Sequence, residues 1–293
     1  KRMTQLAETL SLVLANQPKP VLSNYELFRE LWAIYQSGSA KYLRGDVPTR
    51  EVFRRTRSLL RSEGIIRQDA DYTSHWRLLV KADAPAEDII CSVDPFCYIA
   101  HMSALQRYGL TNRRPESLLL VEPTPVLRRQ LLRAQMQQDY GSRLENEEVD
   151  IEPAKAVIHP ETVRRRPIDI STTKFYGDRV SIQGSLSRIA TIGQTFLETL
   201  DDPDRCGGIS HVIDIWSEHS RTYLEEIIDR FERSEKAILK VRAGYILEEH
   251  IGIKDSRVLS WLELAQRGSS RVLNPGKPFS PVFSKKWMLS LNV

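Results

Sequence analysis

Four arginines at helical spacing are the residues of this chain best suited to bind an anionic partner. Arg50, Arg54, Arg57 and Arg61 fall within about 60° of one another on the helix predicted over 48–62, because successive helical residues turn by about 100°. Guanidinium groups bond phosphates and guanine edges bidentately, and no acid interrupts this side of the helix. The stripe predicts a nucleic-acid contact, and the alternative interpretation is a solvated helix face.

The opposite side of the same helix is apolar and predicts a core face, made of Val52, Phe53, Thr56, Leu59 and Leu60. Helical patterns over 2–16 and 24–37 precede it, and β-prone runs at 65–69 and 73–80 follow it around a polar turn. Three helices followed by a hairpin form a winged helix-turn-helix, in which the third helix enters the DNA major groove.

Such a domain assigns a role to each candidate DNA-binding residue. We expect Arg50, Arg54 and Arg57 near base edges, and Arg61 and Lys41 near phosphates. Thr49 lies at the helix start, where the helix dipole favours an anion. The wing would contribute Arg67, His75 and Arg77.

The distribution of charge divides the chain. Among its 293 residues, 42 Lys and Arg stand against 38 Asp and Glu, but residues 1–82 alone carry 14 basic and 8 acidic side chains. The remainder is weakly acidic, and the proline-bearing stretch 83–88 lies between the two parts. We therefore expect a DNA-binding domain over 1–82, a linker over 83–88 and a second domain over 89–293.

Composition excludes several classes of protein. A hydrophobic fraction of 41% supports ordinary cores, and no apolar run approaches the roughly 18–20 residues that span a membrane. No signal peptide is recognised at the start of the chain. The three cysteines form no CxxC pair, so we expect no disulfide framework and a cytoplasmic location without membrane partners.

Residues 89–293 show a mixed pattern, so the predicted fold class is α/β of the α+β kind. We expect helices over 98–108 and 126–140, and helices throughout 189–266. Strands are expected at 117–121, 156–159, 168–172, 179–182 and around 287–293.

Three constellations in this part resemble chemical sites. Cys97 and His101 have the i, i+4 spacing of zinc ligands, with Cys91 nearby, but metal sites need three or four ligands and we predict none. Residues 150–155 have the acidic-x-acidic-xx-lysine order of metal-dependent nucleases, but a proline interrupts them. His211 and His219 are interpreted as surface or core histidines. No cofactor and no catalytic residue is predicted.

The run Arg164-Arg165-Arg166 before Pro167 has two interpretations. It is either an exposed loop cluster, neutralised by the acidic run at 145–148, or an accessory patch that binds anions.

Four segments carry a resemblance to a known family. Residues 98–111 resemble the "YISH.SAL...GLT" signature of AbiEi-type proteins, and residues 195–208 are similar to the family's "ERTLLDLL..P...GG". Residues 241–248 resemble "RLGYLLE", and Leu273-Asn274-Pro275 with Trp287 match the tail. The chain departs from the pattern at Gly193-Gln194, which replace Glu-Arg, and at Glu198, which replaces Asp.

AbiEi-type proteins are the antitoxin and transcriptional-regulator half of AbiE-like type IV toxin–antitoxin systems, which serve in phage defence. The resemblance implies a non-enzymatic repressor that binds inverted repeats at its own operon and counters a nucleotidyltransferase-like toxin. Binding an inverted repeat needs two copies of the chain, as a homodimer or assembled cooperatively on DNA. The alternatives are a winged-helix protein-interaction module, a stand-alone regulator without antitoxin activity and, last, a metal-dependent nuclease.

Overall fold

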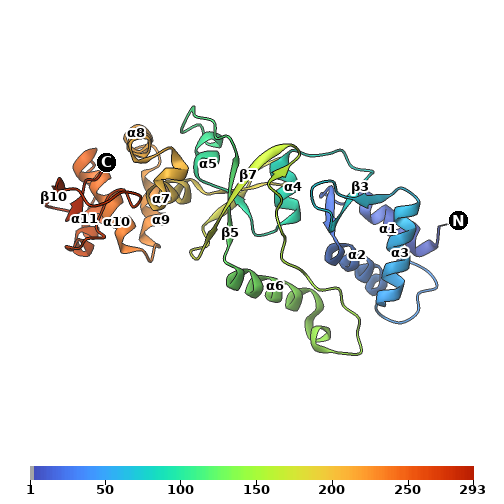
Figure 1. The fold of residues 1–293 in the computed structure, drawn as a ribbon. Coiled ribbons are helices and arrows are strands. Elements are labelled where there is room, and N and C mark those ends of the chain that lie inside the picture. The colour runs from blue at the N-terminus through green and yellow to red at the C-terminus, as the bar shows by residue number, and fades with distance from the viewer. Residues whose placement is uncertain (1–2) are drawn as a thin grey trace.

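The computed structural model describes residues 3–293, and its fold is mixed α/β of the α+β type, as predicted. Three parts follow one another along an elongated molecule: an N-terminal helical part with a small sheet, a central sheet, and a helical C-terminal part (Figure 1). Arg2, where the first helix was expected to begin, lies outside the described residues.

The N-terminal part has the element order and strand pairing of a winged helix-turn-helix. Its elements are α1 (Gln5–Ala15), β1 (Val21–Ser23), α2 (Asn24–Ser37), α3 (Arg50–Ser62), β2 (Ile66–Gln68) and β3 (His75–Leu78). Strand β3 lies between β1 and β2 and is antiparallel to both. The three predicted helices and the hairpin are confirmed. The sequence does not predict β1, because three residues are too few to show an alternating pattern.

Local signals explain why these helices begin and end where the sequence predicts. Ser23 and Glu26 form a capping box at the start of α2, each side chain bonding the other's backbone N–H. Gly38 ends α2 in the left-handed conformation at φ 64°, which glycine adopts without strain. The Thr49 side chain caps α3 by accepting a hydrogen bond from Val52 N.

The core of the N-terminal part includes a residue from the rest of the chain. Phe28 packs edge-on against Phe53, with ring centroids 5.2 Å apart. Tyr140 is buried in the same core, and its ring centroid lies 5.1 Å from that of Trp32. Because Tyr140 ends helix α6 (Pro125–Tyr140), this helix joins the N-terminal part to the central part (Figure 1).

The central part is a six-stranded sheet with the strand order β6-β7-β5-β4-β9-β8. Its strands are β4 (Tyr98–Ile99), β5 (Leu118–Pro123), β6 (Thr162–Val163), β7 (Arg166–Thr173), β8 (Arg179–Ser181) and β9 (Arg188–Ala190). Helices α4 (Ala86–Val93) and α5 (His101–Arg107) accompany it, and the 3-10 helix η1 (Gly141–Glu145) follows α6. The predicted strands near 117–121, 168–172 and 179–182 and the helix over 126–140 are confirmed.

Two expectations for this region are wrong, and a helix begins within a third segment. The helix predicted over 98–108 begins only at His101. Tyr98 and Ile99 form strand β4 instead, because they are buried between β5 and β9. Residues 156–159 pair with no strand in the described chain, so the predicted strand is absent. The predicted linker 83–88 overlaps α4, which begins at Ala86 and packs against β1 because its apolar side chains are buried there.

The C-terminal part is helical, as predicted, except that Ile189 and Ala190 belong to β9. Its helices are α7 (Ile192–Asp201), η2 (Pro203–Cys206), α8 (Ile209–His219), α9 (Leu224–Glu232), α10 (Ala237–Gly244), η3 (Tyr245–His250), α11 (Ser256–Ser260) and η4 (Trp261–Leu264). A hairpin of β10 (Phe283–Ser284) and β11 (Leu289–Ser290) closes the chain. Trp287 covers Gly244, where an added Cβ would lie 2.2 Å from the indole ring.

Candidate nucleic-acid interface

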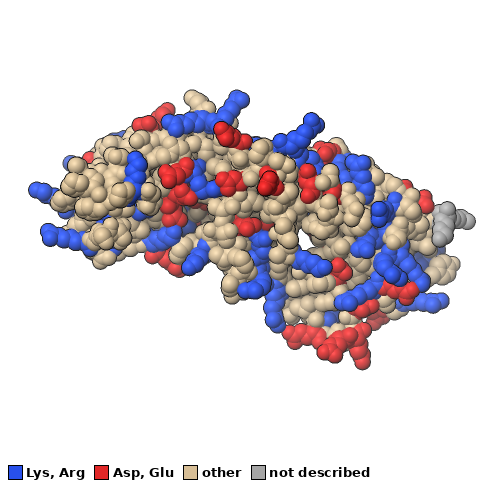
Figure 2. Space-filling view, in the orientation of Figure 1, with Lys and Arg blue, Asp and Glu red and all other residues tan. Residues whose placement is uncertain are grey.

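The outer face of α3 carries cations whose side chains are not bonded to any of the described residues. Arg54 and Arg61 are exposed, and their side chains form no hydrogen bond or ion pair among residues 3–293. Thr49 is exposed at the start of the same helix and keeps its hydroxyl hydrogen available, because its oxygen is the acceptor in the cap. Figure 2 shows Lys and Arg side chains gathered over the region where Figure 1 draws α3.

Two further predicted cations are exposed beside this helix. Lys41 lies in the loop between α2 and α3, and Arg67 lies on β2. Neither side chain is bonded within the described residues. Together with Arg54 and Arg61 they form a surface on which a duplex could place its phosphates, and we call these four residues the α3 surface.

Arg57 does not belong to this surface, which corrects the prediction. Its Nη1 donates to Asn24 Oδ1 at 2.7 Å. Its guanidinium lies over the rings of Phe53 and Trp76, at 5.2 and 5.4 Å from their centroids. Since these contacts hold the group against the N-terminal core, Arg57 stabilises the fold instead of reaching DNA bases.

Arg50 is exposed but bound by an acid from the central part. Its backbone N–H donates to Asp150 Oδ2 at 2.9 Å, its Nε lies 3.8 Å from Asp150 Oδ1, and its Nη2 donates to Ile151 O at 3.4 Å. A carboxylate therefore lies at the N-terminus of α3, where the helix dipole favours a phosphate. Arg50 can reach DNA only in competition with Asp150.

The wing residues His75 and Arg77 are buried, so their predicted role is also wrong. Arg77 bonds three backbone carbonyls, of Pro20, Leu78 and Lys81. The His75 ring bonds Ser74 Oγ through Nδ1, and burial lowers the pKa of His75 below its ordinary value. Both side chains are enclosed because β3 is the central strand of its sheet and is covered by the rest of the chain.

The turn of the wing is held by the arginine cluster of the central part. Arg164 donates to both carboxylate oxygens of Asp69, at 3.2 and 2.6 Å, and also bonds Asp71. Burial acts to raise the pKa of Asp69, but hydrogen bonds from Arg164 and the Tyr72 backbone outweigh it and hold that pKa below its ordinary value. The wing is therefore fixed to the central part.

These contacts correct both interpretations of the arginine run. Arg164 is bonded to acids of the wing and Arg166 pairs with Glu87 at 3.1 Å, so neither forms an exposed patch. The acids that neutralise the run are therefore Asp69, Asp71 and Glu87, and not the acidic run at 145–148. Arg165 alone of the three is exposed and unbonded within residues 3–293.

The fold does not bring together the side chains that the metal and nuclease interpretations require, among the described residues. Asp94, Cys97 and His159 offer ligand atoms within 4.8 Å of one another, and His101 is not among them. His159 already uses both ring nitrogens, with Tyr72 Oη and Asp94 Oδ2 each 2.9 Å away. This arrangement is a hydrogen-bond network, which Arg128 extends from Asp94 to Glu122.

The acids of residues 150–155 have separate surroundings. Asp150 caps Arg50, and Glu152 lines a cavity described below. Among the described residues, neither acid belongs to a group of three or more side chains that could hold a metal ion.

Sequence reasoning missed a buried acid in the C-terminal part. Glu198 on α7 accepts hydrogen bonds from Tyr98 Oη, His101 N and Gln194 Nε2 at 3.1, 3.3 and 3.0 Å. Burial raises the pKa of Glu198 to about 7, against the lowering effect of these donors. Tyr98, His101 and Glu198 all lie in two of the segments that resemble the family, so the motif matches could have indicated that these residues lie together.

No family model matches the chain, and no curated protein matches it. The chain is similar to the crystal structure of RV2827C protein from Mycobacterium tuberculosis, at 13% identity and a TM-score of 0.46, over 99% of this chain and 92% of that chain. At this level the likeness says nothing of function.

Among the described residues, no helix has both the length and the apolar character needed to cross a membrane.

Proposed function

We propose that this protein is a DNA-binding transcriptional repressor of its own operon. The observation that carries the proposal is the α3 surface: Lys41, Arg54, Arg61 and Arg67 are exposed and unbonded on a winged helix-turn-helix. These side chains have no bonding partner among the described residues, and their positive charges attract phosphates strongly. Arg54 lies one turn into α3, and the N-terminal residues of a recognition helix contact base edges; Arg61 is the penultimate residue of α3, where we expect a phosphate contact.

The antitoxin half of the proposal rests on the sequence resemblance. The matched segments lie in β4 and α5, in α7, and in α10 with η3, and α7 contacts both α5 and α10. We propose that this packed region counters a nucleotidyltransferase-like toxin. On an inverted repeat, two copies of the chain would bind, one to each half-site.

Fluorescence anisotropy with the upstream intergenic DNA tests the first half. We expect affinity to fall steeply between about 50 and about 200 mM salt, because phosphate contacts release counterions. Arg54→Ala or Arg61→Ala should each weaken binding by about 1–3 kcal/mol where a base contact is lost, or lower the salt slope by about one where a phosphate contact is lost.

The matched control is Arg267→Ala, which removes an exposed arginine from the far end of the molecule. If Arg54→Ala and Arg61→Ala bind as the control does, at both salt concentrations, DNA is not the ligand of the α3 surface. Coexpression with a nucleotidyltransferase-like neighbour tests the antitoxin half: growth should be rescued by the full chain, and growth arrest that persists would refute this half of the proposal.

A further inference from the structure

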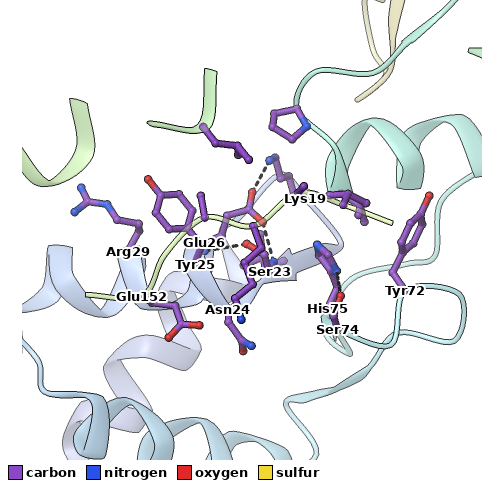
Figure 3. Close-up of a pocket in the computed structure, with 18 of the residues that line it drawn as sticks. Lys19, Ser23, Asn24, Tyr25, Glu26, Arg29, Tyr72, Ser74, His75 and Glu152 are labelled. Atoms are coloured by element: carbon purple, nitrogen blue, oxygen red, sulfur yellow. Dashed lines mark hydrogen bonds and ion pairs between the residues drawn. The ribbon is translucent and has the colours of Figure 1, made fainter. Parts of the chain in front are cut away.

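A large cavity separates the N-terminal part from the central part. Its volume is about 920 Å³, and it lies between the start of α2, the turn before β3 and the segment 152–160. Figure 2 shows an opening between the two parts of the molecule in this region. In Figure 3, Lys19 and Glu26 near the start of α2 and His75 beside β3 reach into the same space, which Glu152 also lines.

The segment 152–160 forms one wall and has no partner strand. It runs from the loop after η1 towards β6 without helix or strand (Figure 1). Its sequence Ala156-Val157-Ile158-His159 nevertheless favours a strand. Between Lys155 and His159, the backbone makes one hydrogen bond in the described chain, from Arg128 Nη1 to Val157 O. The remaining backbone groups of this stretch are free to pair.

This wall is held in place although it is unpaired. Tyr140 Oη donates to Glu152 O at 2.8 Å, and the His159 ring is bonded between Tyr72 and Asp94. Pro153 and Pro160 border the stretch and lack N–H groups themselves. A segment held at both ends loses little conformational entropy when a strand pairs with it.

Ile158 gives this wall an exposed apolar side chain. Its side chain is 90% exposed, the largest exposure of any isoleucine in the described chain. An unpaired strand edge with an exposed apolar residue is the feature that β-augmentation uses, in which main-chain bonds give affinity and side-chain contacts give selectivity.

The charge of the cavity selects the side chains of the partner. Five acids and three bases line it; Lys19 pairs with Glu26 and Arg164 pairs with Asp71, which leaves three acids against two bases and an excess of one negative charge. The acids are Glu26, Glu30, Asp71, Asp139 and Glu152, and the bases are Lys19, Arg29 and Lys155. The walls also include apolar residues such as Val93, Phe96 and Leu132. This lining suits a chain that alternates apolar and basic residues.

We propose that the cavity receives an extended peptide segment of a partner protein, which pairs with residues 155–159 as an added strand and carries alternating apolar and basic side chains. The inference is independent of DNA binding, because no residue of the α3 surface lines the cavity. A peptide bound there would contact the N-terminal and central parts at once.

The test uses the full chain and the blocked hexapeptide acetyl-(Lys-Val)3-amide. Hydrogen exchange of residues 155–159 should be fast in the free protein, because their amides are unpaired within the described chain, and should slow at saturating peptide. The reversed-charge peptide acetyl-(Glu-Val)3-amide and a Lys-Val peptide N-methylated at alternate amides should give no protection. Anisotropy of the labelled peptide gives its affinity.

Ile158→Asp should weaken the Lys-Val peptide at least about tenfold, the scale of one buried apolar side chain, and Ile158→Val should restore most of the affinity. The matched control is Val126→Asp, at a 57% exposed valine on α6 outside the cavity, which should bind as the wild type does. The inference is overturned if the Lys-Val peptide gives no protection, or if the N-methylated peptide protects equally. It is also overturned if protection rises with protein concentration alone, since the occupant is then a second copy of this chain.

Discussion

Replacing Arg164 by alanine tests how firmly the wing is held to the central part. The Asp69 side chain is 1% exposed and receives two hydrogen bonds from Arg164 and two from the backbone N–H groups of Asp71 and Tyr72. Breaking a buried ion pair from one side costs about 3–5 kcal/mol. Because Asp69 keeps its two backbone donors, we expect the lower end, about 3 kcal/mol.

Urea unfolding followed by tryptophan fluorescence measures this loss, with Arg165→Ala as the matched control. Arg164 and Arg165 both have a left-handed backbone, at φ 49° and 63°, so alanine makes the same backbone change at each. Arg165 is exposed and unbonded within the described residues, and its replacement should stay within about 0.5 kcal/mol of the wild type.

The pH dependence gives the same prediction a second readout. The pKa of Asp69 is depressed in the folded protein, so the contact stabilises the fold above the ordinary Asp pKa and this stabilisation is lost as the pH falls through the depressed value. The difference between Arg164→Ala and wild type should therefore be large at pH 7 and shrink in acid. Equal stability of Arg164→Ala and Arg165→Ala at pH 7 would refute the reasoning.

Two further predictions concern acids of the central and C-terminal parts. Asp150→Asn should tighten DNA binding a few-fold at low salt, because it removes a carboxylate from the start of α3. The control Glu263→Gln, at an exposed distal site, should leave DNA binding unchanged. This prediction rests on the proposed function, and equal affinities of the two variants in anisotropy would contradict it. The change that Glu198→Gln makes to the free energy of unfolding should favour the folded state more at pH 8 than at pH 5. Since the pKa of Glu198 is raised to about 7, the wild-type fold binds an extra proton between about pH 4.5 and 7 and loses stability as the pH rises through that window. Urea unfolding at both pH values checks it, and a pH-independent difference would show that Glu198 titrates normally.

The sequence predicts which residues of α3 are exposed, but not which of them bond to another segment. Helical periodicity decides which side chains point away from the core, so Arg54 and Arg61 are placed correctly. Periodicity does not show which outward side chain meets another segment. Arg57 bonds Asn24 and Arg50 meets Asp150, 33 and 100 residues away, and such partners exist only once the chain has folded.

The wing shows the same limit for strands. An alternating strand predicts one face exposed to solvent, and Arg77 is expected on that face. All four residues of β3 are buried, so both of its faces are covered, while β1 and β2 pair with its two edges. The segment 156–159 shows the converse: its strand propensity is real, but no strand of the described chain lies beside it to pair.

The position of Tyr140 bears on how this protein can be dissected. A fragment ending at the predicted boundary near residue 82 would keep α3 and its arginines but lose the ring that contacts Tyr25, Phe28 and Trp32. It would also lose Arg164, the partner of the buried Asp69. A protease that cuts near residue 84 would thus nick the chain without releasing a self-sufficient N-terminal unit, and the two pieces would stay associated and unfold together.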